Sequence, residues 1–516
     1  MKKQTVTQGT IILIIAGFIS KILGMFNRII ITRQLGHEGV GIFMLIQPTI
    51  MLLATFASLG LPVAIPALIS RGNSRQKKIL SVSLIIAMLS SLIVSIILFF
   101  AARPLAEVLL KDERTYLPLL SIGPLLFCIS LSTILKAYFQ GEQNMTPSAI
   151  STLIEQVVRT LATIGFVSIM MPYGIVYGVV GVIWASIVGE LASSFILIMM
   201  FFKNMSQNHQ GATLKPPRLN SQNFKDVLNI SFPTTGSRLI GSFTHFLEPI
   251  IIIQALYRIG YSSQASSKMY SAVAGFALPV LLMPSFISQA ITQSIIPPIS
   301  HAYTKGNFKL IHRHLTTAFQ LSFVISGLYT ILVMIFPMEI MNFLYNTSTG
   351  SEYVLYMAPF FLLLYFQSSL TATLQAIDEA KMAMRSSFIS SIIKILLMIA
   401  LLQVPSLNIL GLVITIIFNI VLLTLWHYYL VRKKVGYRAS YRSIINGFLV
   451  IGITYLLGQY LTTTLIISEH PTLNMLGLIA LITLSYLVLI TLCGLFPKQF
   501  LPERKKLQKI DKPIIA

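Results

Sequence analysis

The sequence predicts an all-α polytopic membrane protein of about 14 transmembrane helices, with two six-helix lobes related by a parallel repeat plus two C-terminal helices. Composition is the first reason. Of 516 residues, 55% are hydrophobic and only 10% are charged, with a mean hydropathy of +0.79. A soluble chain of this length would need far more charge to cover its surface. The second reason is that apolar runs long enough to cross about 30 Å of hydrocarbon recur along the whole chain. The third is that short motifs of the first half return in the same order in the second half.

The apolar runs give the expected spans in order. The first run, 9–31, follows two lysines as a signal peptide would, but it has no A-x-A cleavage site, so we interpret it as an uncleaved first helix. The other spans are expected at 40–69, 79–101, 117–139, 148–171, 176–202, 227–256, 269–299, 314–336, 353–376, 383–403, 408–431, 443–465 and 475–496.

Basic residues predict the orientation of these spans. Of the 38 Lys and Arg residues, five lie inside spans and 27 lie on the side of the membrane that holds both termini. The opposite side carries the other six, which are Arg33, Arg103, Lys111, Arg114, Arg258 and Lys268. This bias is the positive-inside pattern, and it predicts a multi-pass protein of the cytoplasmic (inner) membrane with cytoplasmic N- and C-termini. The net charge of +22 is then explained by basic loops beside anionic lipids, and no nucleic-acid partner is expected.

Similar motifs in the two halves indicate an internal repeat. The motif SKILG at 20–24 is similar to SRLIG at 237–241, and IPALIS at 65–70 is similar to IPPIS at 296–300. The stretch 140–159 aligns with 375–394 without a gap, which places Arg159 on Lys394 just as the first match places Lys21 on Arg238. Because six helices are an even number, both units enter the membrane from the same side. Transporters with such parallel repeats rock one half against the other around a central site.

The repeat also divides the chain into expected parts. The N-lobe is expected at 1–202 (helices 1–6) and the C-lobe at 227–431 (helices 7–12), joined by a polar cytoplasmic linker at 203–226. Two further helices, 13 and 14, are expected within 432–497, followed by a basic cytoplasmic tail at 498–516.

Five cations lie well inside the predicted spans, where each costs about 2.5–3.5 kcal/mol on insertion scales and therefore usually faces a wet interior. They are Lys21, Arg28, Arg159, Arg238 and Lys394. Lys21 and Arg28 are seven residues apart and so share one helix face. Lysine offers phosphate a point charge and arginine a bidentate fork. We therefore predict a cavity for an anionic substrate.

Two of these cations can also be accounted for without a substrate. Glu155 lies four residues before Arg159, so the two can instead neutralise each other. Arg28, near the end of the first span, can instead extend its side chain to the membrane interface. Lys394 differs, because it has Ser390 where Arg159 has Glu155 and so lacks that local partner.

Acidic residues inside the spans are fewer: Glu155, Glu190 and Glu248. Together with His245, which lies seven residues after Arg238, they are candidates for ion coupling or for pairing with the cations. An exporter of cationic drugs would be expected to show the opposite balance of charges. There is no Walker A loop and no GxGxxG motif after a strand, and the two cysteines lie far apart without His or Cys companions. We therefore expect no enzyme activity, no catalytic or metal site and no cofactor.

Several motifs resemble one family of transporters. SKILG at 20–24, RQLGHEGVG at 33–41 and GLP at 60–62 resemble the polysaccharide-synthesis branch of the multidrug/oligosaccharidyl-lipid/polysaccharide flippase superfamily. GSR at 236–238, LEP at 247–249, GFALP at 275–279 and PSF at 284–286 are similar to the stage V sporulation protein B family. The length and the number of spans also fit, so the resemblance covers essentially the whole chain.

The resemblance implies a V-shaped pair of lobes with two trailing helices, and translocation of undecaprenyl-pyrophosphate-linked lipid II to the outer face of the membrane for spore cortex peptidoglycan. In the MurJ-like relatives, cations of the first helix and of the second lobe line the cavity. That role is carried onto Lys21 by motif and onto Arg238 by repeat position. The MurJ-type motif usually has Arg where this chain has Lys21, and its next Arg falls nearer Asn27 than Arg28. The implied partners are the lipid-linked glycan, anionic lipids and wall-synthesis enzymes.

Three alternatives remain open. The chain can be a flippase for another lipid-linked polysaccharide precursor, a cation-coupled drug antiporter, or a membrane scaffold that recruits wall-synthesis enzymes without transporting anything. The basic character of the expected cavity and the two additional C-terminal helices argue against the antiporter.

Overall fold

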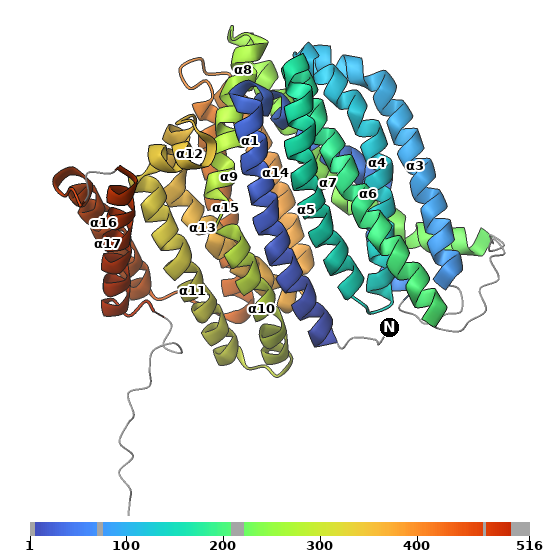
Figure 1. Cartoon of the computed structure of the whole chain (residues 1–516). Helices are drawn as coiled ribbons and strands as arrows, with labels where there is room; N and C mark the ends of the chain where they lie inside the picture. The colour runs from blue at the N-terminus through green and yellow to red at the C-terminus, as the bar shows by residue number, and fades with distance from the viewer. Residues whose placement is uncertain (1–5, 70–75, 208–220, 468–470, 497–516) are drawn as a thin grey trace, which may run out of the picture. The chain divides into compact units, whose positions relative to one another are not determined.

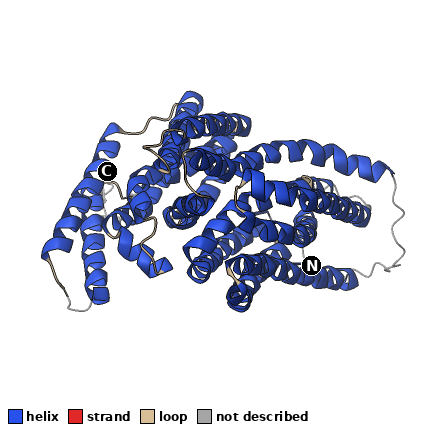
Figure 2. Ribbon diagram, turned by 90° about the horizontal axis from the view of Figure 1, so that it is seen from above, coloured by secondary structure: helices blue, strands red, loops and turns tan. Residues whose placement is uncertain are grey.

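The structure is a computed structural model that describes residues 6–69, 76–207, 221–467 and 471–496. Within these residues the regular elements are helices and no strand occurs (Figure 2). In chain order they are α1 (Val6–Ser58), α2 (Leu61–Ile69), α3 (Gln76–Pro104), η1 (Leu105–Leu109), η2 (Glu113–Thr115), α4 (Tyr116–Gly141), α5 (Thr146–Met170), η3 (Met171–Tyr173), α6 (Ile175–Gln207), α7 (Ser221–Arg258), α8 (Ser263–Ser271), η4 (Ala272–Ala277), α9 (Leu278–Leu281), α10 (Ser285–Thr304), α11 (Phe308–Ile335), α12 (Pro337–Tyr345), α13 (Ser351–Ala376), α14 (Ala380–Leu402), α15 (Leu410–Val435), α16 (Tyr441–Thr464) and α17 (Pro471–Leu492). The all-α fold class is confirmed.

The described residues contain 12 helical stretches long and apolar enough to cross a membrane, and a thirteenth if the bent pair Ser263–Leu281 and Ser285–Thr304 counts as one span. The first stretch, Ile15–Ile69, has 55 residues. A continuous helix of that length would measure about 80 Å, more than twice what one crossing needs. It is broken at Gly36, where φ is 63° and ψ is −174°, so it holds two crossings. With the first stretch counted as two crossings and the bent pair as one, the prediction of about 14 spans is confirmed.

Two details differ from the predicted spans. The expected continuous helix at 269–299 bends by 50° between Leu281 and Ser285, and Pro284 lies in that break. A proline lacks the N–H that a continuing helix would need at this point. The short helix α12 was not predicted, since its nine residues are too few to give a spanning signal.

The described residues fall into two compact units that alternate along the chain. Unit 1 takes its residues from 1–286, 337–357 and 384–423, and unit 2 takes its residues from 287–336, 358–383 and 424–516. The predicted lobe boundaries therefore stay predictions. Residues 208–220 of the expected linker and the whole expected tail lie outside the described residues, as do the basic residues assigned to them.

Unit 1 holds α1 to α9 and parts of the later helices. The helices α3 to α6 lie side by side, with α5 running along α6 and α6 also contacting α4 (Figure 1). Its apolar core includes Leu61 of α2, Val82 of α3, Phe139 of α4 and Leu197 of α6, all fully buried.

Unit 2 contains α11, most of α10 and the helices α16 and α17, which pack as a pair (Figure 1). Its core includes Ile299 of α10, Ile311 of α11, Leu374 of α13 and Val431 of α15. The predicted repeat pairs α2 with α10, α3 with α11, α4 with α13 and α6 with α15. Each unit therefore builds its core from repeat-equivalent helices.

The outer faces of many helices carry large apolar side chains. On α3, Phe99 is 62% and Phe100 is 74% exposed, although the mean hydropathy of this span is 2.8. Such a surface needs hydrocarbon as its solvent, because contiguous apolar area of this extent is not left in water. The protein is therefore a multi-pass helical membrane protein.

Candidate functional site

A cavity of about 220 Å³ in unit 1 brings two of the predicted site residues together. Its lining residues are Lys21, Met25, Arg28, Pro279, Leu282, Met283, Ser285, Phe286 and Tyr345. They come from one face of α1, from the bend between α9 and α10, and from the end of α12. Two cations line this cavity, and none of its lining residues is a carboxylate. Lys21 and Arg28 therefore share a helix face, as their spacing predicted.

Arg28 is held by uncharged groups only. Its Nη1 donates to Oε1 of Gln47 at 3.3 Å, and its Nη2 donates to Sδ of Met44 at 3.0 Å and to the carbonyl oxygen of Ala274 at 3.3 Å. These contacts hold the guanidinium inside the protein, so extension to the membrane interface does not describe its position. Lys21 is exposed and has no ion pair with any residue that the structure describes. No carboxylate therefore neutralises either cation within the described residues.

Arg159 has a different environment, in a cluster of charged residues on α4, α5 and α6. Its Nη2 lies 2.5 Å from Oε1 of Glu155 and 3.4 Å from Oε1 of Glu190. Lys136 Nζ reaches Oε2 of Glu155 at 2.6 Å, and the hydroxyl of Ser132 donates to Oε2 of Glu190. The expected pairing of Glu155 with Arg159 is therefore present. The cluster holds two cations and two carboxylates, so its charges balance.

Close packing of α5 on α6 places this cluster. A Cβ on Gly189 would lie only 2.9 Å from Cβ of Arg159 and 3.1 Å from the carbonyl oxygen of Glu155. The glycine lets the two helices approach, and the next residue, Glu190, is buried against α5 as a result. Buried charges need such partners, because removing them from water is costly.

Lys394 on α14 also has a carboxylate partner. Its Nζ lies 2.6 Å from Oε2 of Glu248 on α7, and both side chains are largely buried. Ser390, which the repeat places on Glu155, donates to Oδ1 of Asn419 on α15 at 2.6 Å. The sequence correctly excluded a local partner for Lys394, and a more distant helix supplies one.

The last two predicted site residues lie on α7. Arg238 and His245 are both exposed, and neither is hydrogen-bonded or ion-paired to any residue in the described ranges. Neither lines the cavity of Lys21 and Arg28. The structure thus brings together Lys21 with Arg28, Arg159 with Glu155 and Glu190, and Lys394 with Glu248.

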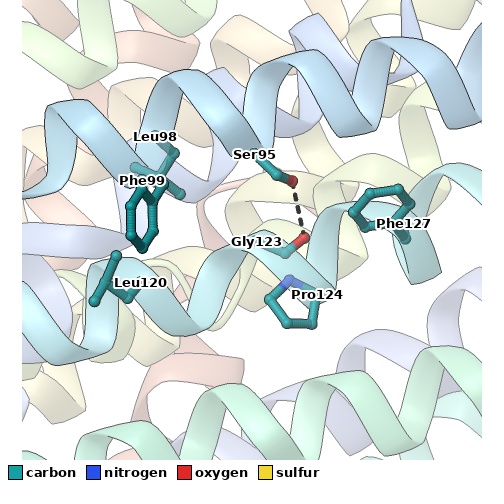
Figure 3. A pocket seen from close by; sticks show the side chains of 7 residues that line it. All are labelled: Ser95, Leu98, Phe99, Leu120, Gly123, Pro124 and Phe127. Atoms are coloured by element: carbon teal, nitrogen blue, oxygen red, sulfur yellow. Dashed lines mark hydrogen bonds between the residues drawn. The ribbon is translucent and has the colours of Figure 1, made fainter.

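A second cavity, of about 410 Å³, lies between α3 and α4 (Figure 3). Leu98, Phe99, Leu120 and Phe127 give it an apolar lining, and no charged residue lines it. Its polar contact is internal, since Ser95 Oγ donates to the carbonyl oxygen of Gly123 at 3.2 Å. This cavity is unsuited to an anion.

Sequence reasoning missed three members of these sites. Lys136 was assigned to a basic loop, although its place three residues before the end of a predicted span was a signal for an intramembrane role. Ser132 gave no signal, because a hydroxyl in an apolar run is common, and Tyr345 lies in the short helix α12, between two predicted spans. Among the described residues no group of three or more His, Cys, Asp or Glu is placed to hold a metal ion.

Several known proteins with similar sequences or structures are membrane transporters or flippases. The family model "polysaccharide biosynthesis protein" matches residues 6–303, and the MatE model matches residues 243–399. The chain is 36% identical to stage V sporulation protein B of Bacillus subtilis over the whole of both chains. It is 22% identical to the lipid II flippase MurJ of the same organism, covering 85% of this chain and 84% of the relative. A solved structure of lipid II flippase MurJ in an inward closed conformation has the same fold, with a TM-score of 0.67 and 17% identity over 93% of this chain and 97% of that one.

Proposed function

The chain belongs to the polysaccharide biosynthesis protein family and, within it, to the stage V sporulation protein B family, and we propose that it flips lipid II across the cytoplasmic membrane. As a member of that family it is a membrane transporter. The proposed substrate is an undecaprenyl-pyrophosphate-linked peptidoglycan precursor, which the protein delivers to the outer face for spore cortex synthesis. The similarity to MurJ, named as a lipid II flippase, supports the substrate class.

One observation carries the proposal: a cavity that holds two intramembrane cations and no carboxylate. An unpaired cation inside a membrane is costly. Lys21 and Arg28 nevertheless stand without an acidic partner among the described residues. A pyrophosphate would supply the missing negative charge, and the low dielectric around it would strengthen each contact.

In the proposed mechanism the cytoplasm-facing state admits the pyrophosphate-sugar head while the polyprenyl tail stays in lipid, near α16 and α17. Lys21, which is exposed, meets the pyrophosphate, and Arg28, two helical turns further along, offers it N–H donors in place of water. Closure of the cytoplasmic side and opening of the outer side then release the head. The sequence has no ATP-binding motif, so the membrane potential, an ion gradient or consumption of the product outside would drive the cycle.

The other predicted site residues take different proposed roles. Arg238, exposed on α7, contributes a further cation from the second lobe. Arg159 and Lys394 already have carboxylates at 2.5 and 2.6 Å, so they can bind substrate only by exchanging those partners. Glu155, Glu190 and Glu248 serve as their pairing partners, and His245, close to Arg238 along α7, remains a candidate for ion coupling.

The proposed orientation has both termini in the cytoplasm, with the basic loops against anionic lipid. Wall-synthesis enzymes are the proposed protein partners. A flippase for another lipid-linked polysaccharide precursor is the second candidate, and the name of the matched family favours it. The MatE match at 243–399 favours a drug antiporter, but a cavity lined by cations disfavours a cationic substrate.

The test measures outward exposure of newly made lipid II in cells whose only candidate flippase is this protein. The Lys21→Ala/Arg238→Ala variant is expected to lose exposure while inserting normally. Lys78→Ala/Arg258→Ala is the matched control, because it removes the same charge from exposed positions on α3 and α7. It is expected to keep full exposure.

Each outcome separates the candidates. Lipid II exposure by wild type and the control, with loss in the Lys21→Ala/Arg238→Ala variant, supports the proposal. No exposure by well-inserted wild type excludes lipid II and favours another lipid-linked glycan or a scaffold. Full activity of the Lys21→Ala/Arg238→Ala variant would remove both residues from the mechanism.

A further inference from the structure

Residues 33–41 of α1 form a turn that the proposed transport step does not use. The predicted first and second spans meet here, at the helix break of Gly36. The predicted orientation places this turn on the outer side of the membrane, together with the segments after α3, after α7 and after α11. In the structure these segments meet, since α1 contacts η2, α8, η4 and α12. Segments that the sequence assigned to one side of the membrane are therefore neighbours.

Two side chains of the turn hold it to the predicted N-lobe. Gln34 donates from Nε2 to Oγ of Ser168 on α5 at 3.2 Å. Glu38 forms an ion pair with Arg114 beside η2, with 2.5 Å between Oε1 and Nη1, and Asp112 holds the same guanidinium at 2.6 Å. The turn is therefore fixed to the helices of this lobe.

Other side chains of the turn reach the predicted C-lobe. Arg33 donates from Nε to the carbonyl oxygen of Leu344 at 2.7 Å and from Nη2 to that of Phe343. Both carbonyls lie in the last turn of α12, where a helix leaves its carbonyls unpaired and a positive charge suits the helix dipole. The ring of His37 stacks on Phe276 of η4, with centroids 5.3 Å apart. One short segment thus contacts two elements of the other lobe.

Next to these contacts the predicted lobes approach closely. A Cβ on Gly41 would lie 2.6 Å from Oγ and 3.1 Å from the carbonyl oxygen of Ser267 on α8. A Cβ on Gly275 of η4 would lie 2.4 Å from Cγ1 of Val40. Ser267 is 1% exposed, so water is excluded from this contact. The outer side is closed here.

The polar contacts between the predicted lobes on this side share one property, which is that the partner is uncharged. Besides the carbonyls that Arg33 binds, Gln254 of α7 donates to the carbonyl oxygen of Val108 at 2.6 Å, and Lys111 Nζ lies 5.5 Å from the ring centre of Tyr257. Among the described residues no ion pair joins the two predicted lobes. Water can replace either partner of an exposed hydrogen bond, so each such bond contributes little net stability. The closure can therefore open without separating opposite charges.

The turn lies on the outer side of the cavity that Lys21 and Arg28 line. Tyr345 of the cavity lining directly follows Leu344, whose carbonyl Arg33 binds. The same two elements, α1 and α12, therefore form part of the cavity and then close beyond it. A substrate that leaves the cavity on the outer side has to part α1 from α12 and η4.

We propose that the turn at 33–41 is a latch that closes the outer end of the transport pathway, with Arg33 as its main hydrogen-bond donor. The inference deepens the proposed function and rests on it for the transport step, whereas the closure is a property of the fold. Loss of the Arg33 side chain leaves the cavity and its cations in place and weakens only the latch. The population of protein that is open to the outside is then expected to rise.

Access to a buried cysteine measures the closure without any transport assay. The reporter is Ser267→Cys in the full-length protein, with both natural cysteines replaced as Cys128→Ser and Cys493→Ser. Ser267 Oγ has no hydrogen-bond partner among the described residues, so the reporter removes no hydrogen bond that the structure shows. A membrane-impermeant charged maleimide is added to right-side-out membrane vesicles, and the labelling rate is normalised to the amount of inserted protein.

The variants are compared in this reporter background. Arg33→Ala is expected to raise the labelling rate about fivefold, because two hydrogen bonds of the guanidinium are lost. Arg33→Lys keeps the charge at the end of α12 and is expected to give an intermediate rate. Arg103→Ala is the matched control, because it removes another exposed arginine from the same predicted side, and the ion pair of Arg103 with Glu107 stays within the predicted N-lobe. Its labelling rate is expected to equal that of the reporter alone.

The labelling pattern decides the proposal. Faster labelling of Arg33→Ala but not of Arg103→Ala supports the latch, and Arg33→Lys decides the same question if Arg33→Ala inserts poorly. Unchanged labelling of the Arg33 variants overturns it. An equal rise for Arg103→Ala, or rapid labelling of the reporter alone, also overturns it, since the first shows a general effect of outer charge and the second an outer side that is not closed. Labelling needs no substrate, so if it follows the expected pattern while lipid II exposure fails, the latch stands and the choice of lipid II falls.

Discussion

The cations Arg159 and Lys394 occupy equivalent places in the predicted repeat but reach their carboxylates in different ways. On α5, Arg159 finds Glu155 one turn away and Glu190 on the adjoining helix α6. On α14, Lys394 has Ser390 in place of that first acid, and it pairs instead with Glu248 of α7. The repeat thus keeps the position of the cation while the source of the negative charge changes.

The two sites also differ in the uncharged residues around the cation. Ser390 bonds to Asn419 of α15, the helix that the repeat pairs with α6. A serine therefore stands at the repeat position of Glu155, and its hydrogen bond to a neutral amide needs no counter-charge. The α4–α6 cluster is complete within its own three helices, whereas the ion pair of Lys394 ties α14 to α7. The first arrangement suits a rigid block, and the second can be broken if α7 moves away from α14.

The largest expected effect comes from removing the shared acid of the α4–α6 cluster. Glu155→Gln leaves Lys136 and Arg159 with only Glu190, which lies 3.4 Å from Arg159. Breaking a buried ion pair in this way is expected to lower the free energy of unfolding in mixed micelles by about 3–5 kcal/mol. A loss below about 1 kcal/mol would show that the cluster is well solvated.

A smaller effect is expected for the corresponding change on α7. Glu248→Gln leaves only Lys394 without its carboxylate, and a buried lysine can release its proton. The free energy of unfolding is therefore expected to fall by about 1.5–3 kcal/mol. Replacing the pair together, as Glu248→Leu/Lys394→Met, is expected to restore stability close to that of wild type. If the double variant were as unstable as the single one, the Lys394–Glu248 pair would not be the cause.

The comparison can also be reversed by moving the acid. Ser390→Glu in the Glu248→Gln background places a carboxylate four residues before Lys394, as Glu155 stands before Arg159. An acid four residues before a base is the favourable orientation of an i, i+4 pair. The new pair is expected to recover about 1 kcal/mol of the lost free energy of unfolding. This is more than a pair on the surface would recover, because the site is buried. Thr371→Glu, on α13 and in unit 2, is the control that adds the same charge elsewhere, and it is expected to recover nothing.

The two hydroxyl partners, Ser132 and Ser390, give a further comparison. Ser132→Ala removes a hydrogen bond to the carboxylate of Glu190, with an expected loss of about 1.5–3 kcal/mol, whereas Ser390→Ala removes a bond to a neutral amide, with an expected loss of about 1 kcal/mol. The same unfolding measurement compares them. Equal losses would mean that charge does not distinguish the two repeats.

The sequence predicted the helical class, the spans and the Glu155–Arg159 contact because all three depend on residues close together in the chain. It did not predict the contact of Lys394 with Glu248, since the two are 146 residues apart and no pattern links them. The predicted gap between the first two spans, 32–39, contains the helix break at Gly36. The sequence did not predict α12, because the helix is short, and it therefore did not identify Tyr345. Spacing put Lys21 and Arg28 on one face correctly, but the tertiary structure was needed to show which cations lack carboxylates.

The separation of Lys394 from Glu248 also bears on biogenesis. As the ribosome delivers helices to the translocon one after another, α5 arrives with Glu155 and Arg159 already one turn apart, so it can partition into lipid as a neutral pair. Helix α14 carries Lys394 without such a neighbour and would incur the insertion penalty of a lone charge. Glu248 of α7 lies 146 residues before Lys394 in the chain, so α7 is synthesised before α14 and its carboxylate is available when α14 inserts. The order of synthesis thus supplies the acid before the base that needs it.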